Sequence, residues 1–176
     1  MNQRIFFCVF LLALLAPSAW AGQQDFKAGP VIKEYGNIAA VPSAPQIDSG
    51  ARFQVAFDVA TAAEPEKLNR QLESAARFIN MHVAAGVPKE NLKLAMVVHG
   101  GAAIDLTSDA KFGSVNPNAG LIAALQEAGV SIQLCGQTAV ARDIRADDLL
   151  PGVTVALSAM TAHAQLQQAG YTLNPF

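Results

Sequence analysis

The segment Leu92–Val98 constrains the fold more than any other part of the sequence. Its letters, LKLAMVV, are nearly all apolar, whereas a strand with one face in water alternates apolar and polar residues. A strand of this kind is covered on both faces, as in a parallel sheet with helices on each side. The segment therefore predicts the centre of an α/β sheet.

Strand and helix patterns alternate around that segment. Residues 52–60, RFQVAFDVA, alternate large apolar side chains and predict a strand. Apolar residues then recur at helical spacing, with Pro65 in the first turn and Gly86 at the end. A second helix is predicted between Asn116-Pro117 and Gly129, and residues 130–134, VSIQL, predict a third strand that runs directly into Cys135.

The same alternation continues to the end of the chain. A short helical segment is predicted through Val140 and Ile144, then a fourth strand over VTVAL, and a helix that Ser158 caps and Gly170 ends. The letters YTL predict a short final strand. This order predicts a parallel or mostly parallel α/β sheet with helices on both faces, in a single domain over residues 51–176.

Residues 1–21 are predicted to be an export signal. Arg4 precedes an apolar run that ends at Ala16, and the triplet Ala19-Trp20-Ala21 fits cleavage after Ala21. The run is shorter than the roughly 20 residues that a membrane span needs, and an uncleaved anchor is the alternative. The mature protein is therefore expected to be periplasmic or secreted, with no membrane span.

Residues 22–50 predict an irregular N-terminal arm, because three prolines and four glycines interrupt both regular periods. Two interpretations stay open. The arm either lies on a surface, where it can mediate subunit contacts, or is a loosely ordered leader.

Charge and cysteine content narrow the function further. The formal net charge is −2 and no long run of one sign occurs, so nothing indicates a nucleic-acid-binding surface. Of the two cysteines, Cys8 lies in the predicted signal. Cys135 is then the single cysteine of the mature chain, which excludes an internal disulfide and places an unpaired thiol in an oxidising compartment.

The predicted site lies where strands end, because ligands of open α/β sheets gather beyond the carboxyl ends of the strands. His99 ends the second strand, followed by Gly100 and Gly101, and Cys135 ends the third, followed by Gly136. Backbone N–H groups after Gly136 favour the thiolate, which is the reactive form of cysteine. Cys135 and His99 are the predicted catalytic pair.

The same residues allow both a functional and a purely structural interpretation. Asp105 and Gln137 are expected to line the pocket with the three glycines. Against this, unpaired cysteines are often small core residues, and histidines at strand ends often only satisfy backbone groups. Asp105 and Asp109 suit acid–base chemistry, but acidic residues in such a loop are more often simply exposed to solvent.

No cofactor and no metal are predicted. His82 and His163 form no metal-ligand spacing with Cys135. The sequence contains no G-x-G-x-x-G fingerprint, no P-loop and no G-x-S-x-G elbow, so nucleotide binding and serine hydrolysis are not indicated.

The chain resembles the DsrE/DsrF-like family of sulfur-relay proteins, in particular its exported single-domain members. The likeness runs from GPVIKEYGNIAAVP through FQVAFDVA, LKLAMVVHGGA, NPNAGLIAALQEAGVSIQLCGQTA and DDLLPGVTVALSAM to LQQAGYTL. The HG after the second strand and the CGQTA after the third are its most specific pieces.

The resemblance implies a three-layer α/β/α fold with about five strands, assembled as a homotrimer or homohexamer. It implies that Cys135 accepts and donates persulfide sulfur, exchanging it with a partner protein or a small sulfur compound. The predicted function is a persulfide carrier or a thiol-redox protein that acts through Cys135. Two alternatives stay open: a non-catalytic oligomeric module that binds a small ligand or a protein and has a structural cysteine and, less favoured, an enzyme based on His99 and the loop carboxylates.

Overall fold

The computed structural model describes residues 22–175, and a five-stranded sheet forms its centre. The strand order is β4-β3-β2-β1-β5, and every neighbouring pair is parallel. The strands are β1 (Phe53–Val59), β2 (Leu92–Val98), β3 (Ser131–Cys135), β4 (Thr154–Ala156) and β5 (Thr172–Asn174). The apolar segment LKLAMVV is β2 and lies in the middle, so the predicted parallel sheet is confirmed. The predicted export signal lies outside the described residues.

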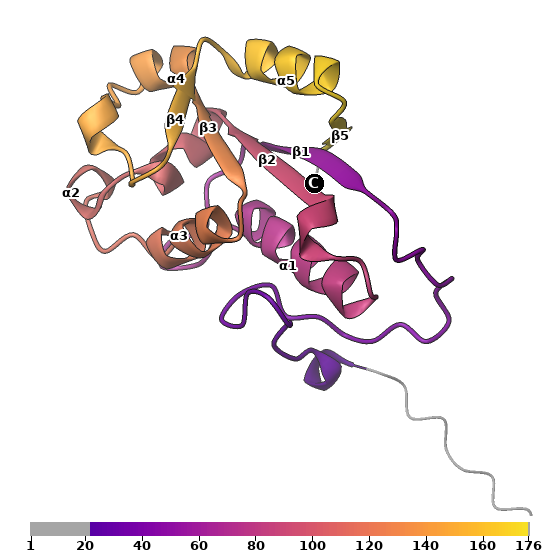
Figure 1. Ribbon diagram of the computed structural model, residues 1–176. Coiled ribbons are helices and arrows are strands. Elements are labelled where there is room, and N and C mark those ends of the chain that lie inside the picture. Colours follow the sequence, from indigo (N-terminus) through magenta and orange to yellow (C-terminus); the bar gives the residue numbers. More distant parts are fainter. Residues whose placement is uncertain (1–21, 176) are drawn as a thin grey trace, which may run out of the picture.

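Helices cover both faces of this sheet, as Figure 1 shows. The helices α1 (Arg70–Ala84) and α3 (Ala119–Glu127) pack together on one face, and α5 (Ala159–Gln168) lies on the other. The remaining elements are α2 (Asp109–Phe112), α4 (Gly136–Ala141) and the 3₁₀ helices η1 (Gln23–Asp25), η2 (Lys89–Asn91), η3 (Gly100–Leu106) and η4 (Ala146–Asp148). The predicted three-layer α/β fold is confirmed. No helix among residues 22–175 is long and apolar enough to cross a bilayer.

The main hydrophobic core lies between the sheet and the layer of α1 and α3. Phe57 of β1 and Met96 of β2 are buried there with Leu72 of α1 and Leu121 of α3. Successive side chains of a strand point to opposite faces. Phe57 therefore faces α1, and its neighbour Asp58 faces the α5 layer.

The helix α1 begins later than the sequence predicts. Pro65 is expected in its first turn, but the helix starts at Arg70. Asn69 caps it, because its Oδ1 accepts hydrogen bonds from the N–H groups of Gln71 (2.9 Å) and Leu72 (3.3 Å). The side chain of Asn69 is buried against Asp105, a contact distant in sequence. Tertiary contacts therefore set the start of this helix.

The arm of residues 22–50 lies along α1 and reaches α3 (Figure 1). The fully buried Asn80 of α1 anchors it. Asn80 Oδ1 accepts hydrogen bonds from the N–H groups of Val31 and Ile32, at 3.1 and 3.0 Å, and its Nδ2 donates to the carbonyls of Ile32, Tyr35 and Gly36. One side chain therefore replaces the sheet or helix bonds that this irregular segment lacks.

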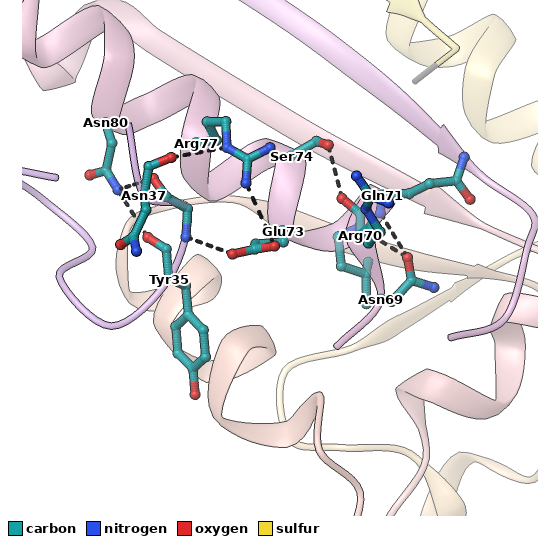
Figure 2. A network of polar contacts seen from close by, with 11 residues as sticks. Tyr35, Asn37, Asn69, Arg70, Gln71, Glu73, Ser74, Arg77 and Asn80 are labelled. Atoms are coloured by element: carbon teal, nitrogen blue, oxygen red, sulfur yellow. Dashed lines mark hydrogen bonds and ion pairs between the residues drawn. The ribbon is translucent and has the colours of Figure 1, made fainter. Parts of the chain in front are cut away.

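A second row of contacts on α1 supports the same part of the arm, as Figure 2 shows. Glu73 accepts a hydrogen bond from the N–H of Gly36 at 3.1 Å, and Arg77 Nε donates to the carbonyl of Asn37 at 3.0 Å. The arm thus lies on the face of the molecule opposite α5.

Asn80→Ala is expected to destabilise the protein by roughly 2 kcal/mol or more, because it leaves buried backbone groups of the arm without partners. Urea unfolding measures the loss, and hydrogen exchange should show faster exchange in residues 31–36. Asn37→Ala is the matched control, because only the backbone carbonyl of the exposed Asn37 contacts Arg77. Equal stability of the two variants would contradict this account of the arm.

Candidate functional site

Three neighbouring strands end at the edge of the sheet that carries the candidate site. Asp58 is the penultimate residue of β1, His99 directly follows β2, and Cys135 ends β3. The parallel register pairs Asp58 with Val97 and Val98 with Leu134. The three side chains therefore leave the sheet at nearly the same level, although they are far apart in the sequence.

Cys135 lies at the junction of β3 and α4, and its exposed fraction is 6%. The residue after it must be glycine, because a Cβ at Gly136 would lie 2.5 Å from the carbonyl oxygen of Ala156 and 3.1 Å from that of Leu157. This close approach of the backbone after β4 brings the start of α5 next to the start of α4. Both helix starts therefore lie beside the thiol.

Two opposing effects act on the pKa of the Cys135 thiol. Burial raises it, because removal from water disfavours the thiolate. Hydrogen bonds from the Thr138 side chain and from the backbone of Thr138, Ala159 and Gln137 act in the other direction. Together they outweigh burial, and the pKa of Cys135 is lowered from its ordinary value. The site therefore favours the reactive form of the thiol.

The Thr138 hydroxyl connects the cysteine to the end of β2. Its Oγ1 accepts a hydrogen bond from the N–H of Gly100 at 3.3 Å. The hydroxyl hydrogen is then free to donate to the sulfur of Cys135, which is the side-chain contribution that lowers its pKa.

Two histidines converge on one carboxylate in the pocket that Cys135 also lines. His99 Nε2 lies 3.1 Å from Asp58 Oδ1 and 3.3 Å from Asp58 Oδ2. His163 Nε2, from α5, lies 2.8 Å from the same Oδ1. We call these three side chains the His–Asp–His cluster. It joins β1, the end of β2 and α5.

A pocket of about 300 Å³ contains the cluster and the cysteine together. Its lining residues are Asp58, His99, Cys135, Gln137, Thr138, Ser158, Ala159, Met160 and His163. A nucleophile, two imidazoles and a carboxylate therefore share one small cavity, an arrangement suited to proton transfer coupled to chemistry at sulfur.

The structure brings some of the sequence-predicted residues together here. His99, Cys135 and Gln137 line the pocket, and Gln137 Nε2 donates to the carbonyl of Leu157 at 3.3 Å. Gly136 follows the cysteine at the crossing described above. Gly100 and Gly101 begin η3 and lie against the backbone after β1, so they shape the turn next to His99.

Asp105 lies apart from this pocket. It is 1% exposed, and its Oδ2 accepts hydrogen bonds from the N–H of Ala63 at 2.9 Å and from Asn69 Nδ2 at 2.6 Å. Burial raises the pKa of Asp105, and these two hydrogen bonds lower it by less, so it is above its ordinary value. Asp105 therefore stabilises the loop between β1 and α1 through these two hydrogen bonds.

That loop encloses a larger hollow of about 550 Å³, lined by residues 61–64 and 67–71. Neither a cysteine nor a histidine is among its lining residues. The smaller pocket is therefore the candidate functional site. Asp109 and His82 also lie elsewhere: Asp109 accepts a hydrogen bond from the N–H of Asn116, and the His82 ring stacks on Phe78 in α1.

Sequence reasoning missed Asp58 as a site residue, and it weighed His163 only as a metal ligand. One signal for Asp58 was available, because it is the only acidic residue of a strand whose large side chains are apolar, and it lies near the carboxyl end. His163 is brought in by the packing of α5 and gives no comparable signal. Among residues 22–175, no group of three or more His, Cys, Asp or Glu is arranged to hold a metal ion.

Comparison with known proteins identifies the family. The DsrE/DsrF-like family profile matches residues 54–175. The chain belongs to the DsrE/DsrF-like family. Membership in this family suggests sulfur relay or redox chemistry in general. A comparison with curated protein sequences finds no match.

Two solved structures share the DsrE-like fold. Protein MTH1491 from Methanobacterium thermoautotrophicum, described as of unknown function, is 22% identical with a TM-score of 0.56. The match covers 70% of this chain and 99% of MTH1491. The ychN protein from E. coli is 20% identical with a TM-score of 0.52, and the match covers 70% of this chain and 100% of ychN. At these identities the likeness concerns the fold alone.

Thr138→Val is expected to raise the pKa of Cys135, because valine keeps the shape of threonine but donates no hydrogen bond to the sulfur. The absorbance of the thiolate at about 240 nm, followed against pH, measures the shift in the pKa. Thr161→Val is the control, since the Thr161 hydroxyl contacts Ser158 and not the cysteine. An unchanged titration in Thr138→Val would show that the Thr138 side chain does not stabilise the thiolate.

Proposed function

We propose that the protein is a sulfur carrier that holds sulfane sulfur as a persulfide on Cys135. The observation that carries this proposal is the combination at one pocket of a cysteine with a lowered pKa and the His–Asp–His cluster. Family membership supports the same class of chemistry. Cys135 is the nucleophile, and His99, which lines the same pocket, is the group that accepts and releases protons.

The loading step follows ordinary thiol chemistry. The thiolate of Cys135 attacks the outer sulfur of a donor R–S–SH, so that a bond forms between Sγ and that sulfur while the donor S–S bond breaks. The donor leaves as R–S⁻, and Cys135 becomes Cys–S–SH. Atoms and charge balance, and no external oxidant or reductant is needed.

The pocket is suited to hold one extra sulfur atom. Its volume of about 300 Å³ is at the small end of the range for ligand sites. Met160 lines it together with the polar Gln137 and Ser158, and a thioether is a soft, polarisable neighbour for sulfur. The low exposure of Cys135 limits access by bulky oxidants.

We place this carrier in the periplasm or outside the cell, on the basis of residues 1–21. Its proposed partners are a sulfur donor and a sulfur acceptor, each either a protein or a small sulfur compound. The proposed chemistry requires no cofactor, since the sulfur is transferred between thiol groups.

Intact mass after exposure to inorganic polysulfide tests the proposal. The folded wild-type protein is expected to gain about 32 Da, the mass of one sulfur atom, and dithiothreitol should remove it. Cys135→Ser is the control and should gain nothing at this position. If wild type and Cys135→Ser behave alike, the cysteine is a structural residue and the binding-module alternative is favoured.

We further propose that the protein forms a homotrimer or homohexamer through the surface around the pocket. DsrE-like proteins are generally oligomeric. Four apolar side chains near the pocket are strongly exposed: Val140 (83%), Val155 (51%), Leu157 (73%) and Met160 (80%). We call these four residues the apolar rim. Apolar surface of this kind around a site marks a contact with another molecule.

Leu157→Lys is expected to lower the mass of the assembly in solution, because a charge in an apolar interface costs binding free energy. Size-exclusion chromatography with light scattering measures the mass. Val115→Lys is the matched control, since Val115 is similarly exposed, at 79%, but lies outside the rim, before α3. A monomeric wild-type protein, or an unchanged mass in Leu157→Lys, would contradict self-association through the rim.

A further inference from the structure

We propose that Asp58 gives the two histidines of the cluster different roles. Asp58 fixes both rings with the proton on Nε2, so that His99 retains an unprotonated Nδ1 and accepts the proton released during sulfur transfer. His163 is a positioning residue that acts through Asp58. This inference rests on the proposed function and names the proton acceptor of the discharge step.

The Asp58 carboxylate determines which ring nitrogens of the two histidines carry a hydrogen. An ionised carboxylate only accepts hydrogen bonds. Both His99 Nε2, at 3.1 Å, and His163 Nε2, at 2.8 Å, lie within hydrogen-bond distance of Asp58 Oδ1. Each Nε2 must therefore carry a hydrogen. In a neutral imidazole the other nitrogen, Nδ1, is then an acceptor.

The rings of His99 and His163 differ in their surroundings. His163 Nδ1 is buried and has no hydrogen-bond partner among the described residues. A hydrogen on that atom would be a buried donor without an acceptor, which is unfavourable. The His99 side chain is 31% exposed, against 14% for His163. An additional proton is therefore better accommodated on His99, where water can solvate it.

Among the described residues, no other charged group lines the pocket and competes with Asp58 for the two histidines. Its titratable lining residues are Asp58, His99, His163 and Cys135, and the remaining lining residues are uncharged. They come from β1, the end of β2, β3 and α5, which are the elements packed around the cluster. Asp58 is thus the one carboxylate in the lining that can fix the orientation and the tautomer of the two histidine rings.

The discharge step transfers the outer sulfur from Cys135 to an acceptor thiol. An acceptor thiol R–SH gives its proton to His99 Nδ1, and the thiolate attacks the outer sulfur of Cys135–S–SH. A bond forms between R–S and that sulfur, and the bond to Sγ breaks with its electron pair on Cys135. The products are R–S–SH, the Cys135 thiolate and protonated His99. The thiolate is the form that the hydrogen bonds at Cys135 favour.

Nitrogen-15 NMR of the histidine rings tests the tautomers without any sulfur chemistry. The chain has three histidines. His82 is an internal reference, because its Nδ1 lies 2.7 Å from the carbonyl of Phe78 and must carry the hydrogen. At about pH 8.5, where imidazole is ordinarily neutral, His99 and His163 should carry hydrogen on Nε2 and His82 on Nδ1. A hydrogen on Nδ1 of His99 would overturn the proposal.

Substitution by glutamine separates the two roles in the discharge of loaded protein to dithiothreitol. Glutamine can still donate to Asp58 but cannot accept a proton as imidazole does. His163→Gln should therefore discharge within about threefold of wild type, whereas His99→Gln should slow by about tenfold or more. His163→Phe, which donates nothing to Asp58, should slow discharge more than His163→Gln does, and equal rates in these two variants would contradict the positioning role of His163.

The outcomes distinguish this inference from the proposed function. If wild type takes up no sulfur from polysulfide, the carrier function fails, and the NMR tautomers alone decide whether Asp58 orders the rings. If wild type loads and discharges but His99→Gln discharges equally fast, the carrier stands and the role given to His99 is wrong. Circular dichroism of each variant establishes that it is folded before its rates are compared.

Discussion

Parallel pairing of β1, β2 and β3 is the constraint on which the site depends. In parallel strands all carboxyl ends lie at one edge, so Asp58, His99 and Cys135 meet there. An antiparallel arrangement would send the neighbouring strand end to the opposite edge. Because parallel strands need crossover connections, the helices that cover the sheet also come from this topology, and α5 adds His163 to the pocket.

The thiol shows how the fold prepares a buried group for reaction. Burial alone would keep Cys135 protonated, and the hydrogen bonds at the starts of α4 and α5 reverse this effect. Both helix starts reach the thiol because Gly136, which has no side chain, permits the backbone at Ala156 and Leu157 to pass close to the start of α4. Val155 and Leu157 of the apolar rim lie on either side of Ala156, at this same crossing, and are exposed.

The sequence predicted the parts of this structure that local patterns determine. The continuous apolar run predicted β2, and the ends of the predicted strands gave the positions of Cys135 and His99 at the edge of the sheet. Both patterns can be read within a few consecutive residues. It placed the start of α1 too early, since the cap at Asn69 depends on distant buried contacts. It did not predict the contact between Asp58 and His163, because these residues are 105 positions apart and meet only when α5 packs on the sheet. Asp105 was grouped with the cysteine by its position in the sequence, whereas its side chain turns into the loop after β1.

The pH dependence of alkylation at Cys135, in the folded chain and in the same chain unfolded in urea, tests the central claim most directly. Peptide mass spectrometry reads the modification at Cys135 itself. The account predicts that the midpoint in the folded protein lies below the midpoint in the unfolded chain, because the hydrogen bonds at the helix starts exist only in the fold. A folded midpoint equal to or above the unfolded one would contradict the claim that this site activates a thiol.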